Sequence, residues 1–214
     1  MDSYWQINPN DTISTVSDHL ENNDLDGHEI TIIQDSDSVE GKHIDLNGSS
    51  SRLVAPNDAD FRELTSFTFG AWYYVEEDQP DIRPHYAGHA DQSASTGDGS
   101  ITWLIHGDDP PTSISAGLGG QSNDMVSINA IETEWFHLSL RFDGNNLDLI
   151  INGLIEDSAS AGNPADNGDD FIIGGPSDGS RRLLEGSVDA PFWSRESLDL
   201  SVINDIKNIS PRGG

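Results

Sequence analysis

The chain has 214 residues, with 38 Asp and Glu against 10 Lys and Arg and a formal net charge of −28 at pH 7. This charge excludes nucleic acid as a natural partner, because phosphate binding needs Lys and Arg to displace counterions. No apolar run approaches the roughly 18 residues that a membrane-spanning helix needs, so no membrane insertion is expected. Residues 1–5 lack the basic and apolar regions of a secretory signal, so no signal peptide is expected either.

The acidic residues comprise 27 Asp and 11 Glu, spread over the whole length, against 8 Arg and 2 Lys. This distribution indicates a folded protein whose surface is coated with carboxylates, because a disordered tail would concentrate them in one block. Self-repulsion would destabilise such a protein in dilute buffer. At molar salt the Debye length falls to about 3 Å, which screens that repulsion. The composition is similar to that of proteins from extreme halophiles, and an ordinary acidic protein with calcium sites is the alternative.

Residues 1–40 differ from the remainder and are interpreted as an N-terminal extension before a domain over residues 41–214. Thr12–Glu21 is compatible with a short helix and Glu29–Ile33 with a strand. These elements would either add an edge strand or form an arm that docks on a partner.

From about residue 43 onward, short β-rich runs alternate with turn residues, which predicts an all-β sandwich or barrel. The strongest strand is Ser66–Val75, in which Phe67 and Phe69 share one face while Trp72 and Tyr74 point the other way. Because both faces are apolar in its second half, we expect an inner strand covered on two sides. The further predicted strands are Ile101–His106, Ser113–Leu118, Trp135–Phe142, Leu147–Ile151, Leu154–Glu156, Phe171–Gly175 and Gly186–Trp193. Leu200, Ile203 and Ile206 then have helical spacing.

The order of these segments resembles the laminin-G-like (LamG) group of concanavalin A-like jelly rolls from about Gly41 to Asn208. The resemblance implies a jelly-roll β-sandwich of two antiparallel sheets with a short C-terminal helix. The segments that carry it are Ile44–Val54 as an opening hairpin, Phe67–Trp72, Glu134–Leu138, Phe142–Gly144, Leu149–Gly153, Phe171–Gly175 and Leu184–Asp189.

The resemblance also implies binding of glycans or protein surfaces, often beside a calcium ion at the rim. Calcium takes several oxygen ligands from loops, and the loops His89–Gly99 and Asn163–Asp170 qualify. Within them we expect Asp98 as the first ligand, with Asp91 or Asp166 as the second. Chance clustering on a solvated surface is the alternative in a chain with so many Asp residues, and Ser49–Ser51 stands where the family often has acidic residues.

Related jelly rolls include glycoside hydrolases, so Glu132 and Glu134 are candidates for a catalytic carboxylate pair. Alternate residues of a strand lie about 6.6 Å apart, within the range of such pairs. However, the two glutamates fall in the turn before Trp135, where a solvated pair is expected, so catalysis is not favoured.

Three aromatic residues, Trp72, Tyr74 and Trp103, would stack on sugar rings if their face is open; the alternative is a role in the core.

These observations favour a non-catalytic binding or structural module adapted to high salt. By analogy with LamG-like domains on virions, we expect a turret, decoration or spike subunit on the virion surface of a halophilic archaeal virus, made in the host cytoplasm. Its partners would be a glycan or cell-surface receptor, other virion or capsid proteins and further copies of itself, with residues 1–40 as a tether. A glycoside hydrolase or a calcium-dependent lectin of the same fold is the alternative.

Salt should therefore stabilise the fold. We expect the melting temperature, followed by circular dichroism, to fall when molar sodium chloride is dialysed away, because carboxylate repulsion is then unscreened. An unchanged melting temperature would contradict the halophilic interpretation.

Overall fold

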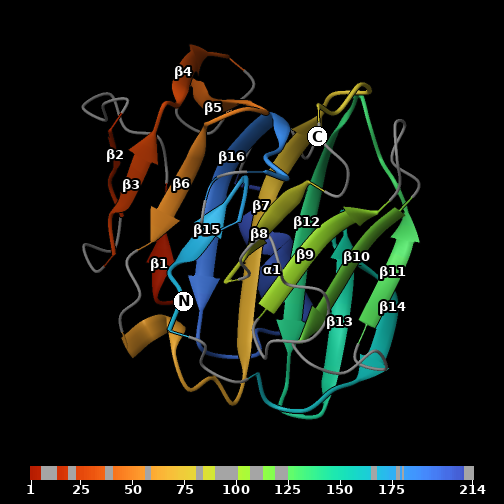
Figure 1. Ribbon diagram of the computed structural model, residues 1–214. Helices are drawn as coiled ribbons and strands as arrows, with labels where there is room; N and C mark the ends of the chain where they lie inside the picture. Colours follow the sequence, from red (N-terminus) through yellow and green to blue (C-terminus); the bar gives the residue numbers. More distant parts are fainter. Residues whose placement is uncertain are drawn as a thin grey trace.

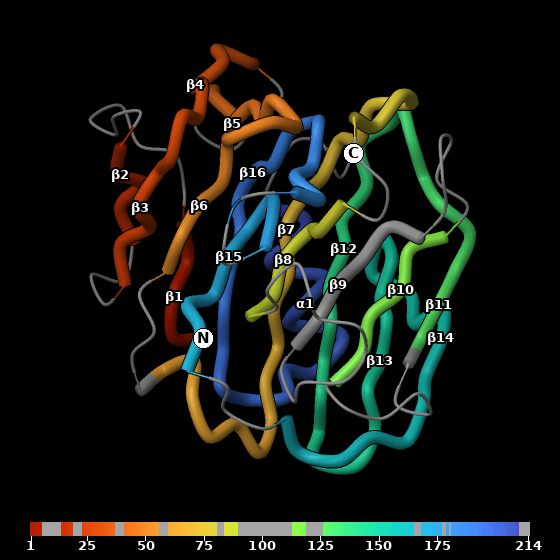
Figure 2. Tube along the Cα trace, viewed as in Figure 1, coloured from red at the N-terminus to blue at the C-terminus, as the bar shows by residue number. Residues whose placement is uncertain are grey.

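The computed structural model describes residues 1–5, 14–18, 23–36, 41–55, 59–80, 84–89, 101–106, 113–118, 125–164, 168–176, 179 and 181–209, with the backbone alone for residues 59, 101–106 and 125. Two antiparallel sheets lie face to face, one in front of the other in Figures 1 and 2, and a helix lies behind the rear sheet. The predicted all-β sandwich of two antiparallel sheets is confirmed.

Sheet A, at the rear in Figure 1, has the strand order β14-β13-β12-β7-β16-β5-β4, and β1 pairs with β16 beside β7. Its strands are β1 (Ser3–Tyr4), β4 (Thr31–Gln34), β5 (Lys42–Asn47), β7 (Phe67–Val75), β12 (Trp135–Phe142), β13 (Asn146–Ile151), β14 (Leu154–Ser160) and β16 (Glu185–Ser194).

Sheet B, at the front, has the order β11-β10-β9-β8-β15-β6-β3-β2. Its strands are β2 (Thr15–Val16), β3 (Leu25–His28), β6 (Arg52–Ala55), β8 (His85–Gly88), β9 (Ile101–His106), β10 (Ser113–Leu118), β11 (Met125–Asn129) and β15 (Phe171–Ile173), and a 3-10 turn, η1, covers Ala59–Phe61.

Aromatic side chains fill the space between the sheets. Phe67 and Phe69, which alternate along β7, are buried with Phe171 of β15 and Trp193 of β16. The rings of Phe67 and Trp193 stack with centroids 5.6 Å apart, and Phe171 lies 5.2 Å from Trp193. Because β7 is the central strand of sheet A, its inward residues contact both sheets and join the two halves of the core.

The helix α1 (Leu200–Lys207) covers part of the outer face of sheet A and confirms the predicted C-terminal helix. Its buried Ile203 and Ile206 belong to a second apolar cluster with Trp72 and Phe192. Gly70 of β7 makes room for this cluster, because a Cβ atom there would lie 2.5 Å from the Phe192 ring. The second half of β7 is thus covered on both faces at Trp72, whereas the next outward residue, Tyr74, stays partly exposed, so the expected double cover holds for part of this half. Among the described residues, no helix combines the length and apolarity needed to cross a membrane.

The predicted opening hairpin is wrong, because its two strands lie in different sheets. β5 pairs with β4 and β16 in sheet A, whereas β6 pairs with β3 and β15 in sheet B. The turn between them is built on Asn47, whose Oδ1 accepts hydrogen bonds from the backbone N–H groups of Ser49, Ser50 and Ser51. This turn carries the chain from one sheet to the other, an arrangement that strand periodicity does not reveal.

The described residues of the first forty belong to the sandwich and do not form a separate extension. They supply strands to both sheets, and Thr15–Val16 is a strand and not part of a helix. Trp5 is 0% exposed in the core, and its indole N–H donates to the carbonyl oxygen of Asn23. The buried Asp18 carboxylate accepts from the backbone N–H groups of Tyr4, at 2.9 Å, and Asn23, at 3.1 Å. These contacts replace the docking arm that the sequence allowed.

Trp5→Ala tests this integration. The substitution should lower the free energy of unfolding by about 3–5 kcal/mol, because it removes a large, fully buried ring. The measurement is chemical denaturation followed by tryptophan fluorescence. Ile33→Ala, at a position that is 37% exposed, is the control and should cost less than about 1 kcal/mol. Equal, small effects would mean that the N-terminal segment contributes little to the core.

Candidate functional site

The helix α1 covers about half of the outer face of sheet A, and the other half is left uncovered by the helix. In the open half, one row of facing residues crosses five strands from β4 to β12. The row is Thr31, Asp45, Ser187, Tyr74 and Trp135, each paired with the next in the strand register. Alternation along β7 thus places Trp72 beneath the helix and Tyr74 beyond it.

Three partly exposed rings form a cluster in this open half, which we call the aromatic platform: His43, Tyr74 and Trp135. The ring centroids of Tyr74 and Trp135 are 5.8 Å apart, and those of His43 and Trp135 are 5.4 Å apart. Thr133, with a left-handed φ of 58°, bends the chain before β12 and donates its N–H to the carbonyl of Val75. This bend brings Trp135 opposite Tyr74 at the start of β12.

Carboxylates surround the aromatic platform. Asp35 Oδ2 lies 3.0 Å from His43 Nδ1, which fixes the orientation of that ring. Burial, reinforced by the Glu76, Asp45 and Asp78 carboxylates, raises the pKa of Glu185 next to the row. The platform therefore combines ring surfaces with hydrogen-bond acceptors and excess negative charge, a combination suited to ligands rich in hydroxyl groups.

The sequence-predicted aromatic residues have different outcomes. Tyr74 is part of the aromatic platform. Trp72 is 3% exposed and contacts the edge of His137 beneath α1, so it leaves no ring face for a sugar and belongs to the core. Trp103 pairs with Ala116 across β9 and β10, but its side chain lies outside the described part of the structure.

The expected calcium ligands Asp91, Asp98 and Asp166 also lie outside the described residues. Within the part of the chain that is described, no three His, Asp or Glu side chains group closely enough to hold a metal ion. A calcium site in the two loops stays a prediction.

The two glutamates before β12 lie in different environments. Glu134 is exposed, whereas one carboxylate oxygen of Glu132 is buried. The pKa of the Tyr86 hydroxyl is raised by its burial, then by Tyr73 and by the charge of Glu132. Glu132 thus lies close enough to the core to act on Tyr86, unlike the solvated pair that the sequence predicts.

Sequence reasoning did not identify His137, which lies beneath α1 on the outer face of sheet A. Burial, together with the nearby Lys207 charge, lowers the pKa of His137 to about 3. Its ring stacks on Phe192 with centroids 6.1 Å apart, and its Nδ1 is 3.3 Å from Ser139 Oγ. The histidine is therefore a neutral core residue.

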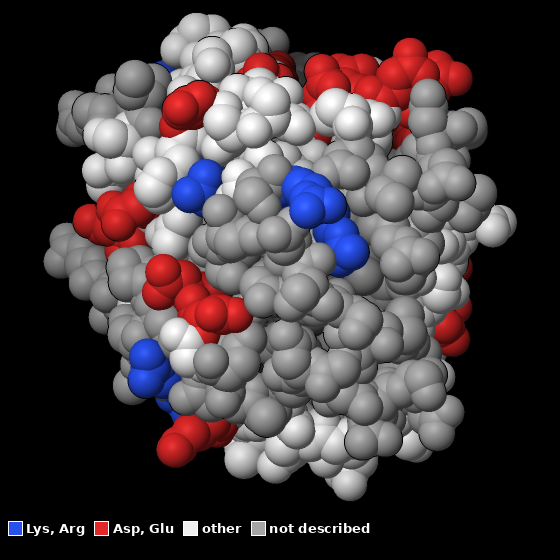
Figure 3. Space-filling model, in the orientation of Figure 1, with Lys and Arg blue, Asp and Glu red and all other residues white. Residues whose placement is uncertain are grey.

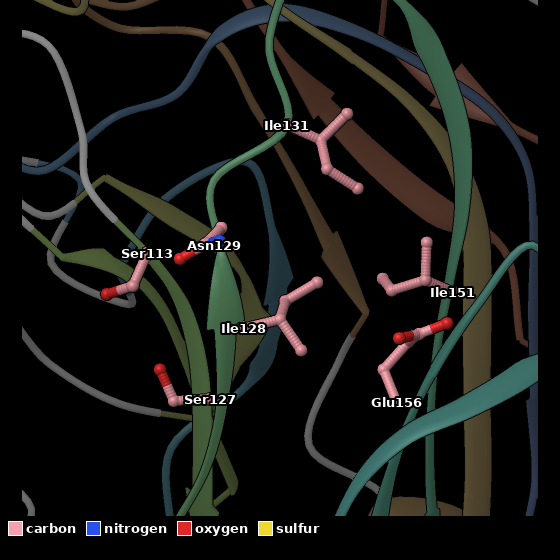
Figure 4. A pocket seen from close by; sticks show the side chains of 7 residues that line it. All are labelled: Ser113, Ser127, Ile128, Asn129, Ile131, Ile151 and Glu156. Carbon is pink, nitrogen blue, oxygen red and sulfur yellow. The ribbon is translucent and has the colours of Figure 1, made fainter.

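A second concave surface, which we call the edge groove, lies between the ends of the two sheets (Figure 4). It has a volume of about 610 Å³. Its lining residues are Ser113, Ser127, Ile128, Asn129, Ile131, Ile151 and Glu156. It was not predicted because β11, which supplies its centre, was not recognised as a strand in the sequence.

The two facing antiparallel sheets, with an aromatic cluster on an open sheet face, define a lectin-like β-sandwich. Residues 47–198 match the family model Laminin_G_3, described as the Concanavalin A-like lectin/glucanases superfamily, and the chain belongs to this family. The predicted resemblance and jelly-roll fold are confirmed. A comparison with curated proteins gave no match.

Solved structures with the same fold include domains of bacterial toxins. The binding domain of Paraclostridial Mosquitocidal Protein 1 has a TM-score of 0.69 and 16% identity, over 96% of this chain and 51% of that one. The receptor binding domain of botulinum neurotoxin D has a TM-score of 0.69 and 11% identity, over 97% and 52%. The binding domain of botulinum neurotoxin DC in complex with SialylT has a TM-score of 0.65 and 12% identity, over 98% and 51%. The chain spans about half the length of these domains, and the likeness shows a shared fold.

His137 should make stability depend on pH. Its pKa is about 3 in the folded chain and 6.5 as an unperturbed group, so the unfolded state takes up the proton first as pH falls below 6.5. The free energy of unfolding should fall by about 2 kcal/mol from this group between pH 7.5 and pH 5. Chemical denaturation at both pH values measures the change. His137→Gln should abolish this contribution, and the same substitution at the exposed His28 should retain it.

Proposed function

We propose that this chain is a non-catalytic, lectin-like binding module that holds a glycan, free or on a cell-surface receptor, at the aromatic platform. The observation that carries the proposal is the cluster of His43, Tyr74 and Trp135, whose rings are partly exposed beside α1. Contiguous aromatic surface that stays accessible on a sheet face is a feature of ligand sites, and these three neighbouring rings provide such a surface.

The aromatic platform offers both aromatic rings and carboxylates, which match the apolar face and the hydroxyl groups of a sugar. The C–H face of a pyranose ring is apolar and packs on an aromatic ring, while its hydroxyl groups donate to carboxylates. The Asp45 carboxylate and the Ser187 hydroxyl belong to the same row as Tyr74 and Trp135. Because Asp35 orients His43 at 3.0 Å, part of the platform is ordered before a ligand arrives, which reduces the entropy cost of binding.

The comparisons support binding over catalysis. The family includes both lectins and glucanases, but the similar toxin structures are named as binding domains. The two glutamates considered as a catalytic pair lie in different environments, which does not favour a shared role in glycoside hydrolysis.

The biological setting is also a proposal. The composition supports a protein that works in concentrated salt, and Figure 3 shows described acidic side chains as separate patches around the face formed by sheet B, with basic side chains among them. We propose a turret, decoration or spike subunit on the virion of a halophilic archaeal virus, assembled as a homo-oligomer with other virion or capsid proteins. Calcium bound in the loops that contain Asp91, Asp98 and Asp166 would belong to the same proposal.

Trp135→Ala and Tyr74→Ala test the platform. Each should weaken binding to the best ligand of a glycan array by about 10-fold, because each removes a stacking ring. Affinities are measured by titration calorimetry in molar salt. Leu154→Ala, at an exposed position on β14, is the control and should leave affinity unchanged.

Two further arms separate the alternatives. Loss of binding in EDTA would indicate a calcium-dependent lectin, and release of reducing sugar from a polysaccharide panel would indicate a glycoside hydrolase. An array without any bound glycan would contradict the proposed ligand class.

A further inference from the structure

The edge groove lies where the last strands of the two sheets meet. Among the described strands, β11 pairs with β10 alone in sheet B, and β14 pairs with β13 alone in sheet A. The side chains of Ile128, Ile131 and Ile151 point toward one space in Figure 4, and the Glu156 carboxylate lies at its rim. The volume of about 610 Å³ falls within the range typical of ligand pockets, roughly 300–1,000 Å³.

The free edge of β11 is not open to a further strand along its whole length. The Asp157 carboxylate of β14 accepts a hydrogen bond from the backbone N–H of Ser127 at 2.8 Å. A carboxylate on an edge N–H blocks strand addition at that position. The groove beside it is therefore better suited to a small molecule than to an added β-strand.

The residues that line the edge groove indicate which charge a bound small molecule would carry. Among the described residues that line the groove, Glu156 is the one that is ionisable. It is exposed and makes no ion pair or hydrogen bond within the described part of the chain. A carboxylate beside an apolar surface repels anions such as phosphates and fatty acids and attracts cations. Glu156 is therefore accessible to the cationic group of a ligand bound in the groove.

The lining also separates this ligand from the one proposed for the aromatic platform. The described lining residues include no aromatic ring, so they offer a sugar no surface for stacking. Ile128 and Ile131 are partly buried and pack against the core, so they form a fixed apolar wall. Ser113 of β10 and Ser127 and Asn129 of β11 lie on the side away from Ile128 (Figure 4), and the Ser127 hydroxyl is hydrogen-bonded to Ser115 at 2.9 Å.

We propose that the edge groove is a second ligand site, independent of the platform, which binds a small aliphatic amine. The alkyl chain lies against Ile128, Ile131 and Ile151, and the ammonium group pairs with the Glu156 carboxylate. The two contacts respond differently to salt, because ions screen the charge pair but not the apolar contact.

The test compares three ligands with one alkyl chain: hexylammonium, 1-hexanol and hexanoate. Each is titrated into the full-length, ¹⁵N-labelled chain at one matched ionic strength. Hexylammonium should shift the amide signals of Ile128, Asn129, Ile131 and Ile151, hexanol should shift the same signals with lower affinity, and hexanoate should not. The advantage of the amine over the alcohol should be about two- to five-fold at an exposed carboxylate and should shrink as salt is raised.

Glu156→Gln should remove the preference for the amine and leave hexanol binding in place. Glu77→Gln, the same substitution at an exposed position outside the groove, is the matched control and should change neither. Equal binding of hexanoate, an amine preference that survives Glu156→Gln, or shifts outside the groove would overturn the proposal. A blocked lysine amide that binds much more tightly than hexylammonium would also overturn it, in favour of a lysine side chain from a partner protein.

Discussion

The double burial of β7 is the constraint on which the rest of the structure depends. Its inward residues Phe67 and Phe69 lie in the aromatic core between the sheets, and its outward Trp72 lies under α1. A central strand that is apolar on both faces requires a cover on each side, because an exposed apolar face of this size would promote association. Sheet B supplies one cover and the short helix supplies the other.

The length of that helix also determines where the surface stays open. α1 has eight residues and buries Ile203 and Ile206 against one half of the outer face. The next outward residue of β7 after Trp72 is Tyr74, which is partly exposed; its neighbour Trp135 on β12 packs against the edge of the cluster beneath α1 and is also partly exposed. Two residues of one strand thus have opposite roles, core and surface, because of where the covering helix ends.

Local sequence patterns were sufficient to predict the strands in which alternating apolar residues are bounded by turn residues. Ser66–Val75 and Trp135–Phe142 match β7 and β12 closely, and the apolar spacing at Leu200, Ile203 and Ile206 matches α1. Alternation reports which residues share a face, but it contains no information about which sheet a strand joins. The sequence pattern around Asn47 therefore predicts a hairpin, although the turn there connects strands of two different sheets.

The candidate sites were less predictable than the fold, because they are assembled from distant segments. His43, Tyr74 and Trp135 are 31 to 92 residues apart in sequence, and only the strand order β5-β16-β7-β12 brings their rings together. The aromatic pattern identified Tyr74 but not its neighbours, and it could not distinguish Tyr74 from the buried Trp72. The edge groove has no local signature, since Ile128 and Ile151 come from strands of different sheets.

The aromatic platform and the edge groove differ in chemistry, but carboxylates at both surfaces disfavour negatively charged ligands. Carboxylates border the aromatic platform, and Glu156 lies at the edge groove, in a chain with a net charge of −28. A ligand with negative charge would be repelled at either place in dilute buffer. Concentrated salt would relieve that repulsion, but it would weaken attraction between opposite charges equally. In such a solution affinity has to come from contacts that ions do not screen, which here are the ring faces of the platform and the isoleucine wall of the groove.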